Sequence, residues 1–324
     1  MVRTAGPGHD HRPAARHRLA APRPGRVTLL DAGLVPLEGG HSGETFLGTS
    51  GDEQVVVRIH AGRSAARGDD AVDIDAAVLR LVRGLLPVPE VLEVRRPDPA
   101  SDLPGILVTS FLPGQRLDLV LPDADAELEA RIGANLAELL TRLNRMPFLS
   151  GGPFVDASLR VGSFGPEAAD LRAFAESLLS GPALSAWATT DRDALLDLAD
   201  RSQDLLDPVD RHCLVHSDFN PKNLLVDPRS GAVTGVLDWE FAHAGLPVAD
   251  LGNLLRFERS PAFVAAVLES VRVDGVGHDG PDGLLELARA ADLWALLDLA
   301  SRAGENPVAG RAHDHLLALT RRPG

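Results

Sequence analysis

The sequence predicts an α+β protein with two lobes, a small antiparallel β-sheet with one helix followed by a larger, mainly helical part. Short β-branched and apolar segments separated by Gly and Asp turns dominate residues 27–112, whereas apolar residues at helical spacing dominate residues 113–324. Residues 1–26 are rich in Arg, His, Pro and Gly and predict a disordered tail. The expected organisation is therefore a tail (1–26), an N-terminal lobe (27–112) and a C-terminal lobe (113–324).

The elements of the N-terminal lobe follow from its turns and its β-branched residues. A Gly-Asp pair at 51–52 suits a hairpin turn before the buried strand 54–59. Apolar residues three and four apart predict a helix over 70–86, which Pro87 ends. Further strands are expected at 27–30, 34–37, 91–94 and 106–111.

Helical periodicity takes over after the Pro-Gly pair at 113–114. Helices are expected at 124–145, 166–179, 192–206, 261–271, 283–300 and 308–320. Residues 213–238 interrupt them with strand-like composition. A turn at 228–231 would pair strand 224–226 with strand 233–237 and return Asp238 to a place beside Asn223.

The composition excludes several classes of partner. The chain has 46 Asp and Glu against 32 Lys and Arg, a formal net charge of −14 and one Cys. Acidic surfaces repel phosphate backbones, which argues against a nucleic-acid partner and favours a cationic small molecule. No secretory signal and no run of ~20 apolar residues is present. We expect a cytoplasmic protein with no membrane association and no obligate protein partner.

Three oxygen-bearing side chains stand at the ends of apolar strands in the 213–238 segment. They are Asp218, Asn223 and Asp238. Two carboxylates and one amide in a small space suit Mg²⁺ bound through phosphate, and they leave one carboxylate to orient a hydroxyl. Each residue alone is typical of a turn cap. A zinc site from His212, Cys213, His216 and Asp218 is an alternative, although His212 and His216 would share a face only on a helix and residues 213–215 look like a strand.

Two segments carry a resemblance to a known family: HSDFNPKN at 216–223 and LDWE at 237–240. They resemble motifs of the aminoglycoside phosphotransferase family, antibiotic kinases with a protein-kinase-like fold, and the resemblance spans about residues 30–320. It implies that Asp218 is the catalytic base, that Asn223 and Asp238 hold Mg²⁺, and that ATP is the phosphate donor. Ser217 and Lys222 stand where the family commonly has Gly. Asp250, in an acidic turn of the family, is interpreted as an N-cap and scaffold.

The resemblance also assigns nucleotide-binding residues in the N-terminal lobe. Gly40, Ser42 and Gly43 would belong to the hairpin that covers the phosphates, and the backbone of Ser110 and Leu112 would bond the adenine. The only lysine of the chain is Lys222, so Arg58 would hold the phosphates from the third strand. Its acidic partner would be Asp75, since a longer base with a shorter acid spans a similar distance.

The acceptor is expected between the catalytic loop and the C-terminal helices. Candidate residues are acids that would attract a cation and one apolar platform: Glu240, Glu258, Asp292, Asp298 and Trp294. The N-terminal lobe looks most like capreomycin or viomycin phosphotransferases, so the expected acceptor is a peptide antibiotic of that type or an aminoglycoside. Alternatives are a metabolic kinase for choline, homoserine or an amino sugar, and a pseudokinase that binds nucleotide as a scaffold.

Overall fold

A computed structural model describes residues 33–37, 45–51, 53–61, 67–98, 100–101, 103–166, 170–257 and 259–321. Several predictions fall elsewhere in the chain. The tail 1–26, the strand 27–30, the hairpin residues Gly40, Ser42 and Gly43, and the acceptor candidate Glu258 all lie outside the described residues. The lobe boundaries drawn from the sequence stay predictions.

The N-terminal part is an antiparallel sheet of five strands in the order β1-β2-β3-β5-β4. The strands are β1 (Val35–Pro36), β2 (Thr45–Ser50), β3 (Glu53–His60), β4 (Val91–Arg95) and β5 (Gly105–Ser110). Gly51, in the left-handed region at φ 64°, makes the predicted turn between β2 and β3. Alternation along β3 buries Val55 and Val57 with Val108 in a small cluster. Arg58 follows Val57 directly, so its side chain lies on the opposite face of the sheet.

Helix α2 (Ala71–Val82) is the one helix described in this part, and it packs against the sheet. Its buried stripe, including Val72, Ala76 and Leu79, joins the main core. The helix ends four residues before the predicted end because Gly84 adopts φ 83°.

The C-terminal part is mainly helical. Its helices are α3 (Leu117–Val120), α4 (Ala126–Asn144), α5 (Leu171–Leu178), α6 (Thr189–Leu206), α7 (Ala249–Leu255), α8 (Pro261–Ser270), α9 (Gly280–Ser301) and α10 (Pro307–Thr320), with single 3₁₀ turns η2 (Leu121–Asp123), η4 (Pro221–Asn223) and η5 (Trp239–Phe241). The predicted helices are thus present. The one predicted from 166 starts at 171, because Asp170 caps it by accepting from the Ala173 N–H at 2.6 Å.

Two small sheets in this part carry the loops of interest. In the first, β10 (Leu224–Val226) lies between β11 (Val233–Val236) and β6 (Gln115–Arg116). The pairing of β10 with β11 confirms the predicted hairpin. The second sheet has the order β7-β9-β12-β8, with β7 (Pro147–Phe148), β8 (Gly152–Pro153), β9 (His212–Val215) and β12 (His243–Gly245).

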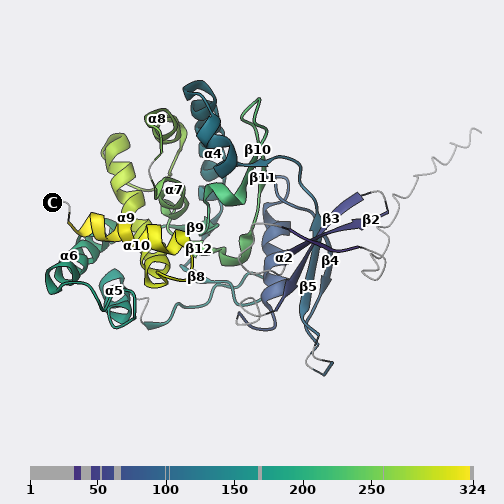
Figure 1. Cartoon of the computed structure of the whole chain (residues 1–324), viewed down its shortest axis with the longest axis horizontal. Helices are drawn as coiled ribbons and strands as arrows, with labels where there is room; N and C mark the ends of the chain where they lie inside the picture. The colour runs from purple at the N-terminus through teal and green to yellow at the C-terminus, as the bar shows by residue number, and fades with distance from the viewer. Residues whose placement is uncertain are drawn as a thin grey trace, which may run out of the picture.

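Figure 1 shows the resulting arrangement: the sheet of β2 to β5 and α2 lies at one end, the helices α4 to α10 lie at the other, and β8 to β12 lie between them. This confirms the predicted α+β fold with an antiparallel N-terminal sheet and a helical C-terminal part. Among the described residues, no helix is both long and apolar enough to cross a membrane.

Candidate active site

The loop between β9 and β10 is held by side chains from α7. The Asp250 carboxylate accepts hydrogen bonds from the backbone N–H groups of His216 and Ser217, both at 2.7 Å. The Asn253 side-chain oxygen accepts a hydrogen bond from the Phe219 N–H at 3.2 Å. Burial raises the pKa of Asp250 above its usual range, which the two N–H donors oppose. The N-cap of α7 is Val248, so Asp250 is a scaffold residue in the first turn and not the cap.

The departure from glycine at position 217 has a structural cost. Ser217 has φ 67°, in the left-handed region that glycine enters most readily. The sharp bend lets successive N–H groups point at the same carboxylate. Ser217 is therefore compatible with the loop but strained in it.

His216 links this loop to the segment that follows β11. Its Nδ1 accepts the Asp218 N–H at 3.2 Å, so its Nε2 carries the proton and donates to the Leu237 carbonyl at 2.8 Å. The ring is fully buried and packs on Trp239 at 4.6 Å between centroids. The Leu237 N–H also donates to the Asn223 carbonyl at 2.8 Å. The two loops therefore hold each other in register.

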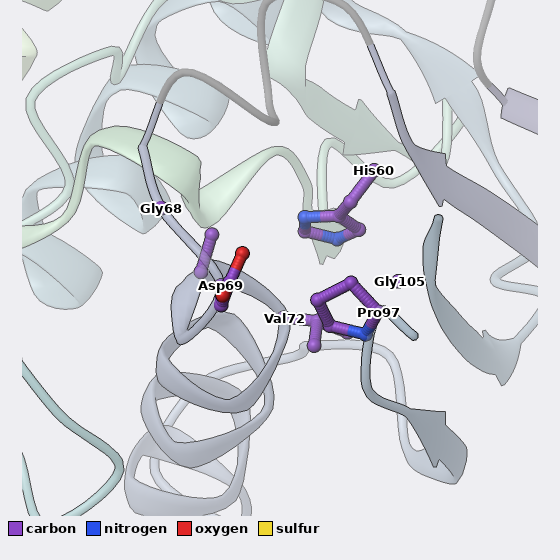
Figure 2. Close-up of a pocket in the computed structure, with 7 residues that line it drawn as sticks. His60, Gly68, Asp69, Val72, Pro97 and Gly105 are labelled. Carbon is purple, nitrogen blue, oxygen red and sulfur yellow. The ribbon is translucent and has the colours of Figure 1, made fainter. Parts of the chain in front are cut away.

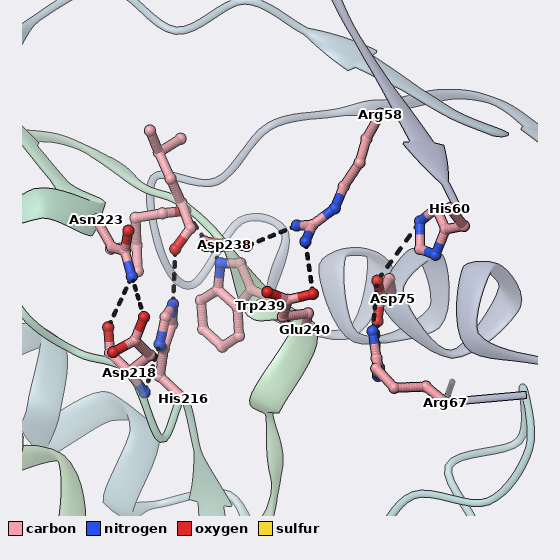
Figure 3. Close-up of polar contacts among 12 residues, drawn as sticks. Arg58, His60, Arg67, Asp75, His216, Asp218, Asn223, Asp238, Trp239 and Glu240 are labelled. Carbon is pink, nitrogen blue, oxygen red and sulfur yellow. Dashed lines mark hydrogen bonds and ion pairs between the residues drawn. The ribbon is translucent and has the colours of Figure 1, made fainter. Parts of the chain in front are cut away.

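The three residues singled out from the sequence meet at this junction (Figure 3). The Asn223 Nδ2 donates to one Asp218 carboxylate oxygen at 2.7 Å, and the Asn220 Nδ2 donates to the other at 2.6 Å. Because Asn223 uses its amide nitrogen on Asp218, its Oδ1 is left to face another partner. Asp238 follows Leu237 directly, in the left-handed region at φ 64°.

Arg58 reaches this junction from β3. Its Nη1 donates to Asp238 and its Nη2 to Glu240, each at 2.6 Å. The Arg58 side chain is only 16% exposed, and its Nε is buried with no hydrogen-bond partner among the described residues. Burial acts to lower the pKa of Arg58, but the two carboxylates raise it further above its usual range.

The expected pair of Arg58 with Asp75 is not formed. The Asp75 carboxylate on α2 accepts hydrogen bonds from both terminal nitrogens of Arg67, at 2.7 and 3.1 Å. Its Oδ2 also lies 3.7 Å from His60 Nε2. The reach of the two side chains alone predicted the Arg58–Asp75 pair. Arg67, which lies just before the helix, binds the same acid.

His60 lines a cavity of about 40 Å³ between the first turn of α2 and the sheet, together with Val72, Pro97 and Gly105 (Figure 2). That volume holds a few water molecules and is far too small for a nucleotide. Burial lowers the pKa of His60, with the Asp75 carboxylate opposing that shift. None of the residues that line this cavity belongs to the junction of Asp218, Asn223 and Asp238.

The segment expected to bond adenine begins at Ser110, the last residue of β5. The Ser110 N–H already donates to the Glu90 carbonyl at 2.9 Å, and the Ser110 hydroxyl accepts the Glu90 N–H at 2.9 Å. The Ser110 N–H is thus not available to a base, and its carbonyl and the backbone of Leu112 remain the candidates.

The acceptor candidates that the structure describes are dispersed. Asp292 is buried in α9, where it accepts from Asn253 at 2.6 Å and from two Arg256 nitrogens at 2.7 Å. Asp298 is exposed and pairs with Arg302 one turn on at 2.6 Å. Glu240 accepts a hydrogen bond from Arg58. Trp294 packs on the ring of Phe174 from α5 at 5.3 Å. These contacts argue against a common acidic wall.

The zinc interpretation of residues 212–218 does not fit the contacts. Both ring nitrogens of His216 bind backbone atoms, and the buried Cys213 thiol lies 3.6 Å from the Asn144 side-chain oxygen. In the part of the chain that the structure describes, no three His, Cys, Asp or Glu side chains are grouped to hold a metal ion.

Sequence reasoning missed Asn253 and Arg256 and did not predict that Glu240 binds Arg58. Asn253 and Arg256 lie on or just after α7, a helix too short and too thoroughly buried to show periodicity. The signal for Glu240 was its spacing, two residues after Asp238 in the same motif.

Residues 33–287 match the phosphotransferase enzyme family, abbreviated APH, which is well over half of the chain. The chain belongs to this family. Membership in the APH phosphotransferase family confirms the resemblance drawn from the motifs at 216–223 and 237–240.

Several solved structures are similar to this family member. A thermostable mutant of aminoglycoside phosphotransferase APH(4)-Ia, in complex with ADP and hygromycin B, is 20% identical with a TM-score of 0.62, covering 90% of this chain and 94% of that one. Aminoglycoside 2′-phosphotransferase-IIIa, solved with GDP, is 17% identical with a TM-score of 0.65 over 89% and 91%. A microcompartment-associated aminopropanol kinase is 20% identical with a TM-score of 0.60 over 90% and 92%. At these identities the likeness shows the shared kinase-like fold.

Curated relatives match over a short segment. Acyl-CoA dehydrogenase family member 11 of Rattus norvegicus is 40% identical over 55 residues, and that of Gallus gallus is 38% identical over 73 residues. The matches span 17% and 22% of this chain but only 7% and 9% of those much longer proteins.

Proposed function

We propose that this chain transfers the γ-phosphate of ATP to a hydroxyl of a cationic small molecule, either an aminoglycoside or a peptide antibiotic of the capreomycin or viomycin type, and so confers resistance. The observation that carries the proposal is the junction of Asp218, Asn223 and Asp238, with Arg58 directed at it from the sheet. Family membership supports the reaction class. ADP and hygromycin B in the similar APH(4)-Ia structure support the choice of nucleotide and acceptor.

The donor set fits a nucleotide and a magnesium ion. Asn223 Oδ1 and the Asp238 carboxylate are the hard oxygen ligands that Mg²⁺ prefers, and with so few protein ligands phosphate oxygens would complete the shell. The buried Arg58 Nε is a donor that a phosphate oxygen would satisfy. Bound there, Mg²⁺ would supply neutralisation of the charge on the phosphates.

Asp218 is the group that would act on the acceptor. Its carboxylate would accept a hydrogen bond from the acceptor hydroxyl and take its proton as the oxygen bonds to the γ-phosphorus. The bond between that phosphorus and the ADP oxygen breaks in the same displacement. The Asn220 and Asn223 amides hold the carboxylate in place, so the rate gain would come mainly from positioning.

A coupled assay of ADP release with a panel of acceptors tests the proposal. The panel contains aminoglycosides, capreomycin, viomycin, choline, homoserine and amino alcohols, and a sensitive host expressing the chain provides the resistance test. Turnover confined to cationic antibiotics, with raised resistance, is the expected result. Absence of ADP release with every acceptor would favour a nucleotide-binding scaffold.

Two variants separate the proposed roles. Asp218→Asn should lower kcat by roughly 10²–10⁴-fold. The affinity for ATP should change little, because the Asp218 side chain would contact the acceptor and not the triphosphate. The amide of this variant can accept from only one of the two neighbouring asparagines, so the melting temperature must be recorded alongside. Asn223→Ala should instead raise the Mg²⁺ concentration needed for half-maximal rate. A large loss of ATP affinity in Asp218→Asn would contradict the assignment.

A second candidate is a metabolic kinase for a small amino alcohol. The contacts of Asp292 favour it. Because Asp292 binds Asn253 and Arg256, one acid fewer is available to bind a polycation. The similar fold of an aminopropanol kinase is consistent with it. Turnover of amino alcohols without turnover of antibiotics in the same panel would select this candidate.

A further inference from the structure

Arg58 is held between the two parts of the molecule by acids from the segment after β11. Its partners Asp238 and Glu240 lie 180 and 182 positions further along the chain. The side chains of Arg58 and Glu240 are each only 16% exposed, whereas that of Asp238 is 36% exposed. Glu240 is therefore the better buried of the two acids that fix the guanidinium (Figure 3).

The acid on α2 is already engaged elsewhere. Asp75 is bidentate with Arg67, and its side chain is 5% exposed. A carboxylate that accepts two parallel N–H bonds from one guanidinium is saturated on that side by a strong, planar contact. Arg58 makes no hydrogen bond to Asp75 and directs both of its terminal nitrogens to Asp238 and Glu240 instead.

The segment that carries Glu240 is held by packing contacts and by a buried hydrogen bond. Glu240 lies in η5, which packs against α2, and it follows Trp239, whose Nε1 donates to the Val236 carbonyl at 3.0 Å. Trp239 also stacks on the buried His216 ring. The position of Glu240 is thus tied to the same contacts that set the catalytic loop.

We propose that Glu240 is the positioning residue for Arg58, and that it does the work in this chain that an acid of α2 was expected to do. The inference rests on the proposed function, since it assumes that Arg58 holds the phosphates. Asp238 has a second task as the candidate Mg²⁺ ligand, so its carboxylate is shared when the metal binds. Glu240 then retains the guanidinium through Nη2, and the buried, unpartnered Nε is left as a donor for a phosphate oxygen.

The arrangement also couples the nucleotide cation to the catalytic loop. Because Glu240 and His216 are both fixed by Trp239, a shift of Arg58 is resisted by the segment that sets Asp218. An acid on α2 would tie Arg58 to the helix and would act on the catalytic loop only through the packing of α2 against η5. Placing the acid two residues after Asp238 ties it to the phosphotransfer junction.

Binding of the non-hydrolysable nucleotide AMP-PNP, measured by calorimetry with and without Mg²⁺, tests the proposal on the full chain. Glu240→Gln should raise the Kd about tenfold both with and without Mg²⁺, the effect of weakening one charge-assisted contact to phosphate. The Mg²⁺ concentration for half-maximal turnover and the acceptor KM should stay within about twofold. The matched control is Glu93→Gln in β4, since Glu93 is 17% exposed and binds Arg95 at 2.7 Å.

A double-mutant cycle shows whether Glu240 acts through Arg58. In the Arg58→Gln background, Glu240→Gln should add no further loss of AMP-PNP affinity. The same cycle with Asp75→Asn should give additive effects, with a smaller loss for Asp75→Asn than for Glu240→Gln. Each variant is compared at a temperature where its melting curve shows it to be folded.

Three outcomes would overturn the positioning role. They are a shift in the Mg²⁺ requirement that exceeds the change in nucleotide affinity, a change confined to the acceptor KM, and additivity of Glu240→Gln with Arg58→Gln. If the unchanged protein binds no nucleotide, the proposed function and the positioning role fall together. If it binds nucleotide and the cycle shows no coupling, only the positioning role falls.

Discussion

Ser217 shows that the catalytic loop contains a strained backbone conformation, which brings two successive N–H groups to Asp250. Its left-handed backbone (φ 67°) costs an L-residue roughly 1–2 kcal/mol relative to glycine, part of which is returned by the lower freedom of serine in the unfolded chain. We expect Ser217→Gly to raise the free energy of unfolding by about 0.5–1 kcal/mol, measured by urea denaturation. Ser217→Ala, which keeps the Cβ, should give no such gain. A destabilised glycine variant would show that the hydroxyl itself is needed.

Cys213 is a buried thiol whose ionisation the fold suppresses. Burial, with help from the Asp250 charge, raises the pKa of Cys213 to about 12. The thiol ionises in the unfolded chain at its ordinary pKa of about 8.5, so unfolding releases a proton at alkaline pH. The contribution of Cys213 to stability is therefore complete below pH 8.5 and is lost as pH rises towards 12.

We expect the free energy of unfolding to fall between pH 9 and 11 by up to about 1.4 kcal/mol per pH unit more in the unchanged protein than in Cys213→Ala. Native protein should also react slowly with a thiol reagent at pH 8 and quickly once denaturant is added. Equal pH slopes for the two proteins would show that the thiol is as acidic when folded as when unfolded.

The candidate catalytic residues could be predicted from sequence because they are close along the chain. Asp218 and Asn223 are five residues apart, and one tight hairpin returns Asp238 to them. The partner of Arg58 could not be predicted in this way. It depends on which of several acids reaches β3 across a sequence separation of 180, and on Arg67 engaging Asp75 first.

At the scale of elements, α9 shows why an acid on a helix cannot be assigned from its residue type. Asp292 and Asp298 both lie on this helix, yet the first is buried and the second exposed. The difference arises from α7, which approaches α9 so closely that a Cβ on Gly252 would clash with the Ala288 carbonyl oxygen. This contact brings Asn253 and Arg256 onto Asp292. Alpha-helical periodicity had predicted α9 well and could not reveal the short helix that covers it.

The two acids of α9 should differ sharply when removed. Asp292→Ala leaves a buried Arg256 guanidinium unpaired and should lower the free energy of unfolding by about 3–5 kcal/mol. Asp298→Ala breaks an exposed pair with Arg302 and should cost less than about 0.5 kcal/mol. Denaturant titrations of both variants check this. If Asp292→Ala were as stable as the unchanged protein and bound a cationic acceptor less tightly, Asp292 would belong to the acceptor site after all.

For the whole molecule, the net charge of −14 offers a way to test the class of acceptor. Long-range attraction of a polycation weakens as the Debye length shortens from ~10 Å at 0.1 M salt to ~3 Å at 1 M. We expect kcat/KM for a polycationic acceptor to fall steeply with KCl, mainly through KM, and that for a neutral acceptor to stay nearly constant. Steady-state kinetics over this salt range measure both. Equal salt sensitivity would mean that the acidity serves solubility and that the acceptor need not be cationic.

The bond between β3 and the segment after β11 also sets the order of events while the chain is being made. At about 5–20 residues per second, a ribosome needs roughly 10–40 s to advance from Arg58 to its partner Asp238, 180 positions later. During that interval the nascent N-terminal part already contains Arg58, Arg67 and Asp75, but neither of the acids that bind Arg58 in the finished protein. We expect the two arginines to compete for Asp75 until Asp238 and Glu240 emerge. The ion pairs of Arg58, a residue in the part of the protein that is synthesised first, can therefore form only after the segment with Asp238 and Glu240 has been made.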